Sequence, residues 1–154
     1  MSDSPELKKI GSAAAAMLRP LASASIVQMV GLLKPYDEDY ERVFVGRAAG
    51  DARIGYEQLW MNPPRGFGKP GQSEVHAFAV QAKMLATEKD FSMEFPGGYR
   101  KIAELLVPDR IWLRFKFVEP GKSTGMAYDG LVWLDGRWAW FPKPWHVISA
   151  PPSN

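Results

Sequence analysis

The feature that most constrains the fold lies near the C-terminus, where Asp135-Gly136 separates two strand-like runs rich in tryptophan. A two-residue hairpin turn of type I′ needs positive φ at both central residues, and Asp-Gly adopts it readily. We therefore predict a tight hairpin within residues 125–145, and this turn sets its register. The predicted cross-strand pairs are Leu134 with Arg137, Trp133 with Trp138, Leu131 with Trp140, and Asp129 with Pro142.

Side chains alternate between the two faces of a strand, so this register predicts which hairpin residues lie together. The first face, which we call the tryptophan face, carries Leu131, Trp133, Trp138 and Trp140, and the register adds Asp129 to it. The opposite face is predicted to carry Tyr128, Val132, Leu134, Arg137, Ala139 and Phe141.

The tryptophan face has two interpretations. In the first, it lines a cavity in which the four apolar residues contact a ligand and Asp129 acts as a general acid or base. In the second, Trp133 and Trp138 are a packed cross-strand pair in the core, and Asp129-Gly130 marks a bulge or an exposed strand edge.

Hydrophobic periodicity divides the remaining chain into a helical part followed by a sheet. Helical spacing extends over residues 4–60, and a loop rich in glycine and proline covers residues 61–72. Residues 73–148 contain strands, among them Glu74–Gln81 and Ile111–Val118, with a short helix inserted near Tyr99, and residues 149–154 form a tail. This order predicts a single α+β domain.

The helical first third, the strand IWLRFKFVEP and the closing hairpin GLVWLDGRWAWFP resemble the NTF2-like (cystatin-like, SnoaL-like) superfamily. The resemblance implies N-terminal helices packed on a curved antiparallel sheet that forms a cone. Members of the superfamily include isomerases, dehydratases, cyclases and binding subunits without activity. The resemblance also implies a homodimer formed through the sheet, which a monomeric mass in light scattering would contradict.

Composition excludes several classes of function. The chain has 154 residues with a net charge of +2, and acidic and basic residues alternate along it, so we expect neither nucleic acid nor membrane as a partner. The apolar run Leu21–Leu33 is too short to span a bilayer. No cysteine is present, which excludes thiolate chemistry and suits a reducing, cytoplasmic compartment. The spacing of the two histidines predicts no metal site, and no cofactor is expected.

Two polar residues besides Asp129 are candidates for the predicted cavity. His76 is in phase with apolar residues of the strand Glu74–Gln81, and a His76–Asp129 pair would suffice for proton transfer. Tyr99 is a candidate hydrogen-bond donor and ligand contact. The alternative is that His76 is a hydrogen-bonded residue of the core.

Two further patterns are associated with nucleotides. Gly66–Gly71 matches G-x-G-x-x-G, but it follows Pro-Pro and precedes a strand, so we predict a mobile loop, or a lid over the cavity, rather than a phosphate site. Trp112, Arg114 and Lys116 share one strand face and could stack bases, although the low net charge favours a solvated face.

Three functions are compatible with these features. We expect a non-catalytic module that binds a small apolar ligand or a protein partner. The alternative is a cofactor-independent isomerase, dehydratase or cyclase that uses Asp129 and His76. A third hypothesis is that exposed tryptophans stack on a polymeric ligand. The segment Phe141–Trp145 either recognises a partner or blunts a sheet edge.

Overall fold

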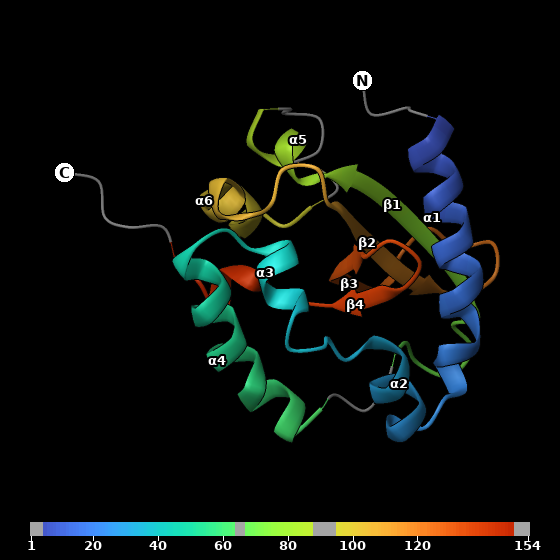
Figure 1. Ribbon diagram of the computed structural model, residues 1–154. Coiled ribbons are helices and arrows are strands. Elements are labelled where there is room, and N and C mark those ends of the chain that lie inside the picture. The colour runs from blue at the N-terminus through green and yellow to red at the C-terminus, as the bar shows by residue number, and fades with distance from the viewer. Residues whose placement is uncertain (1–4, 64–66, 88–94, 150–154) are drawn as a thin grey trace.

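The computed structural model describes residues 5–63, 67–87 and 95–149. In this part of the chain, helices surround a four-stranded antiparallel sheet (Figure 1). The strands follow the order β1-β2-β3-β4, so the sheet is an open meander with β1 and β4 at its edges. In chain order the elements are α1 Pro5–Leu18, η1 Arg19–Ser23, α2 Ile26–Leu33, α3 Asp39–Val43, α4 Arg47–Met61, β1 Glu74–Gln81, α5 Ala82–Thr87, α6 Gly98–Ile102, η3 Ala103–Leu105, β2 Ile111–Val118, β3 Gly125–Trp133, β4 Trp138–Trp140 and η4 Pro144–His146.

The helical part confirms the prediction from periodicity. Helices occupy most of residues 5–61, and β1 and β2 have the predicted bounds. Helix α2 begins with a capping box, in which the Ser25 hydroxyl accepts from the Gln28 backbone at 3.1 Å while the Gln28 side chain accepts from the Ser25 backbone at 2.9 Å. Helix α5 lies in a stretch for which the sequence predicted neither helix nor strand. Ser4, the first residue of the predicted helical part, and residues 88–94 and 150–154 lie outside the described part.

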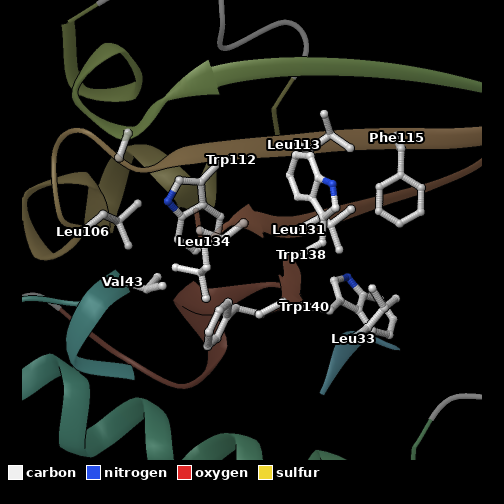
Figure 2. Close-up of a cluster of buried hydrophobic side chains, with 14 of the residues drawn as sticks. Leu33, Val43, Leu106, Trp112, Leu113, Phe115, Leu131, Leu134, Trp138 and Trp140 are labelled. Atoms are coloured by element: carbon white, nitrogen blue, oxygen red, sulfur yellow. The ribbon is translucent and has the colours of Figure 1, made fainter. Parts of the chain in front are cut away.

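Both faces of the sheet are buried at its centre. Trp112 and Leu113 are neighbours on β2 whose side chains point to opposite faces, and neither is exposed. Figure 2 shows side chains of β2, β3 and β4 meeting Leu33 of α2 and Val43 of α3. Helices and loops therefore cover both faces of the sheet at its centre.

The hairpin confirms the predicted turn and three of the four predicted pairs; the pair of Asp129 with Pro142 does not form, because strand pairing ends at Leu131 and Trp140. Asp135 and Gly136 have φ of 52° and 127°, as a type I′ turn requires. Leu131 pairs with Trp140 and Trp133 with Trp138, whose ring centroids lie 5.0 Å apart. The Asp-Gly signal therefore sufficed to place the tryptophans.

A β-bulge at Asp129-Gly130 corrects the predicted faces beyond this point. One residue of β2 lies between Leu113 and Phe115, whereas two residues of β3, Asp129 and Gly130, lie between their partners Leu131 and Tyr128. The extra residue reverses the alternation, so Tyr128 lies on the side of the tryptophan face. Asp129 turns to the opposite side, which we call the Trp112 face because Trp112, Val132 and Phe141 lie there.

A buried ion pair that the sequence did not suggest ties α3 to the hairpin. Asp39 is fully buried, and its carboxylate accepts from the Arg137 guanidinium and, at 2.7 Å, from the Tyr36 backbone. The Arg137 guanidinium also stacks 4.0 Å from the centroid of the Tyr36 ring. These contacts hold the turn against the helical part.

None of the helices in the described ranges is both long and apolar enough to cross a membrane.

Candidate ligand-binding site

An open pocket lies beside the first half of β3. Strand β4 has three residues and pairs only with Leu131–Trp133, so no strand within the described ranges covers the outer side of β3 before the bulge. Helix α4 and the segment after β4 border this uncovered stretch and enclose a volume of about 440 Å³. The lining residues are Tyr56, Leu59, Met126, Ala127, Tyr128, Asp129, Trp140, Pro142, Lys143, His146 and Val147.

Asp129 is the buried polar group of this pocket. Its exposed fraction is 6%, and its Oδ1 accepts from the Tyr99 hydroxyl at 2.7 Å and from the Lys143 backbone at 2.9 Å. Its Oδ2 accepts no hydrogen bond from the described residues. This oxygen is also not fully sealed from solvent. Oδ2 is therefore an acceptor without a hydrogen-bond donor among the described residues, on a residue that lines the pocket.

The local backbone explains why Asp129 points into this site. The bulge directs its side chain away from the tryptophan face, and Gly130 makes the bulge feasible through a φ of 91°. Next to Asp129, Lys143 has a φ of 48°, which is uncommon for a residue with a Cβ. The hydrogen bond from its backbone to Asp129 helps hold this conformation.

Two buried tyrosines flank the Asp129 carboxylate. Burial raises the pKa of Tyr99 well above its ordinary value, and the charge of Asp129 and their hydrogen bond raise this pKa further. Burial likewise raises the pKa of Tyr56, with smaller contributions from Asp129 and Tyr40. Both phenols therefore remain neutral donors, and the Tyr56 hydroxyl donates to the Pro142 carbonyl at 2.9 Å.

The tryptophan face is mostly packed rather than hollow. Leu131, Trp138 and Trp140 are at most 7% exposed, and the Trp140 ring lies 5.0 Å from the Phe67 ring. Of the predicted ligand-binding residues, Trp140 lines the pocket, Trp133 is half-buried against Trp138, and Tyr99 acts through Asp129. Because of the bulge at Asp129-Gly130 and the packing of Phe67 against Trp140, the predicted ligand-binding residues do not line one cavity together.

The loop that carries Phe67 is anchored rather than open. Phe67 is 3% exposed, and the Gly68 backbone donates to the Tyr128 hydroxyl at 2.7 Å. These contacts hold Tyr128 at the pocket wall and anchor two residues of the loop, whose mobility stays a prediction. Gly66, the first glycine of the G-x-G-x-x-G match, lies outside the described residues.

His76 and Asp129 are not brought together. His76 lies on β1 with its side chain 41% exposed, and its Nε2 is 3.4 Å from the Glu74 carboxylate. Strand β2 separates β1 from β3, so the two candidates are roughly 10 Å apart across the sheet. His146 is exposed and lines the pocket.

Two predicted surface features are buried instead. Trp112 has no exposed area and contacts Tyr99, so it cannot stack bases with Arg114 and Lys116. Within the segment Phe141–Trp145, Phe141 and Pro144 are buried. Aromatic neighbours on the Trp112 face account for both results.

Sequence reasoning missed most of the pocket because its residues come from separate elements. Tyr56 and Leu59 belong to the apolar stripe of α4, which predicted only core packing. Met126 and Val147 carry no signal of their own. The glycine after Asp129 and the lysine between two prolines were the available signs of unusual backbone.

No cluster of three or more potential metal-ligating side chains occurs in the part of the chain that the structure describes. Comparison of the whole chain with protein-family models, with curated proteins and with solved structures gives no match.

Proposed function

We propose that this protein is a non-catalytic ligand-binding domain of the NTF2-like type, with the pocket beside β3 as its binding site. The observation that carries the proposal is an open, mainly apolar hollow of about 440 Å³ with aromatic walls. Small-molecule sites are concave and largely apolar, with volumes of roughly 300–1,000 Å³ and a few polar groups that orient the ligand.

Other hollows support a site less well. The one between α3 and α4 has a volume of about 590 Å³, but side chains such as Glu41, Arg47 and Asp51 that border it are exposed. The pocket beside β3 combines apolar walls with one buried carboxylate, which is the usual composition of a ligand site.

The acid–base alternative loses the pair on which it was based. Asp129 is held by Tyr99 and Lys143, while His76 contacts Glu74. The protein-partner alternative is favoured by α2, which exposes Val27 and Leu32 to 80% and 55%. A homodimer and a cytoplasmic location remain predictions, and the filled sheet centre would restrict a sheet dimer to the margins.

A neutral aromatic probe tests the proposal. We expect phenylpropanol, titrated to about 10 mM, to shift the backbone amide resonances of Leu59, Ala127 and Val147 in two-dimensional NMR, because a ligand of this size binds with roughly millimolar affinity. Ala127→Phe should fill the pocket and weaken binding at least fivefold. Ala16→Phe, an equal change on the exposed side of α1, should not. Absence of saturable shifts, or equal effects of both variants, would overturn the proposal.

A further inference from the structure

We infer that the pocket selects ligands that carry a protonated amine on an apolar body, with Asp129 Oδ2 as the counter-ion. This inference rests on the proposed function and names the class of ligand for that site. It begins from the free oxygen of a carboxylate that is otherwise buried and hydrogen-bonded.

Within the described part of the chain, the Asp129 carboxylate has two donors on one oxygen and none on the other. Both donors, the Tyr99 hydroxyl and the Lys143 backbone, bond to Oδ1, and no side-chain nitrogen of a described lysine, arginine or histidine lies within 4.0 Å of the carboxylate. A buried carboxylate without a counter-ion is costly, and an N–H donor from a ligand would reduce that cost.

The walls around Asp129 also suit a cation. Three aromatic residues, Tyr56, Tyr128 and Trp140, line the same pocket, and aromatic faces attract ammonium groups. Hydrogen bonds from the Tyr56 hydroxyl to Pro142 and from Gly68 to the Tyr128 hydroxyl hold two of these rings in place. The walls are therefore preorganised for binding.

The other charged groups do not reverse this preference. Lys143 and His146 are exposed, so water screens their side chains, whereas Asp129 is 6% exposed. An anionic ligand that entered the pocket would meet the Asp129 carboxylate at close range, and like charges repel most strongly where water is excluded. The geometry therefore favours an amine over both an acid and an alcohol.

Three probes of equal size measure the preference. Phenylpropylamine, phenylpropanol and phenylpropionate would be titrated at pH 7 and followed by the amide shifts of Leu59, Ala127 and Val147. We expect the amine to bind about tenfold more tightly than the alcohol, and the acid to bind most weakly. In Asp129→Asn the ratio of alcohol to amine dissociation constants should fall to about one, because the amide keeps an acceptor for Tyr99 and loses the charge.

A matched variant controls for net charge. Asp109→Asn removes a carboxylate that is 81% exposed and lies just before β2, at the end of that strand away from the pocket. This variant should keep the tenfold ratio of alcohol to amine dissociation constants. If amine and alcohol bind equally to the native protein, or if both variants reduce the ratio alike, the inference fails while the proposed function stands. If none of the probes binds, the proposed function fails with it.

Discussion

Asp129 connects three separate parts of the chain. Its Oδ1 accepts from Tyr99 of α6 and from Lys143 after β4, and its backbone carbonyl accepts from the Trp140 indole at 2.8 Å. Removal of the side chain would leave two donors without their acceptor in a region with little water. The residue therefore has a structural role that is independent of any ligand.

This role predicts unequal effects of two substitutions. Asp129→Ala should lower the free energy of unfolding by about 3 kcal/mol, because it leaves the Tyr99 hydroxyl and the Lys143 backbone unpaired. Asp129→Asn should cost only about 1 kcal/mol, since an amide oxygen can still accept both bonds. Urea unfolding at pH 7 measures the difference. A loss below about 0.5 kcal/mol for the alanine variant would contradict the assigned role.

At the scale of elements, two glycines let η4 and its flanks pack closely on helices. A Cβ at Gly98 of α6 would lie 2.2 Å from the Trp145 ring, and one at Gly55 of α4 would lie 2.5 Å from the Val147 Cβ. Absence of a side chain at Gly55 brings Val147 against α4, next to the pocket.

Helix α4 offers a matched test of this close approach. Gly55→Ala should destabilise the protein by roughly 2 kcal/mol, because the added methyl group overlaps Val147. Gly50→Ala in the same helix meets nothing within 4 Å and should stabilise it by about 0.5–1 kcal/mol through helix propensity. Thermal unfolding of both variants provides the comparison. If Gly50→Ala also destabilises the protein, the predicted gain from helix propensity in α4 is wrong.

At the scale of the whole molecule, an aromatic network crosses the Trp112 face and joins helices to the sheet. Phe141 packs edge-on against Tyr40, Phe44 and Tyr56, with ring centroids 5.5–5.7 Å apart. The hydroxyls of Tyr56 and Tyr99 have their hydrogen-bond partners inside the fold. Global stability therefore depends on keeping these phenols protonated.

This dependence predicts alkaline sensitivity. Because burial raises the folded pKa of Tyr56 and Tyr99 above 10.0, the unfolded chain loses these protons first. Their contribution is complete below pH 10 and declines above it, by about 1 kcal/mol per pH unit for each tyrosine. Urea unfolding at pH 8, 9, 10 and 11 should give a shallower decline in Tyr99→Phe than in the native protein. Equal declines would refute the assignment.

The comparison of sequence with structure separates local signals from long-range ones. The helical part, β1, β2 and the hairpin register were predictable, because caps, periodicity and the Asp135-Gly136 turn act within a few residues. The position of Asp129 was not, because alternation cannot show on which side of a bulge a residue points. Asp39 was missed for a related reason, since its partner Arg137 is 98 residues away.

The sequence by itself determined the order of helices and strands, the tight turn and the pairing of Trp133 with Trp138. Tertiary structure alone decided that both sheet faces are filled, that Phe67 packs against Trp140, and that Asp129 lies beside a pocket. The physical reason is range: hydrogen bonds of turns and caps join near neighbours, whereas burial depends on which distant side chains occupy the remaining space. The candidate site arises where the short β4 leaves part of β3 uncovered.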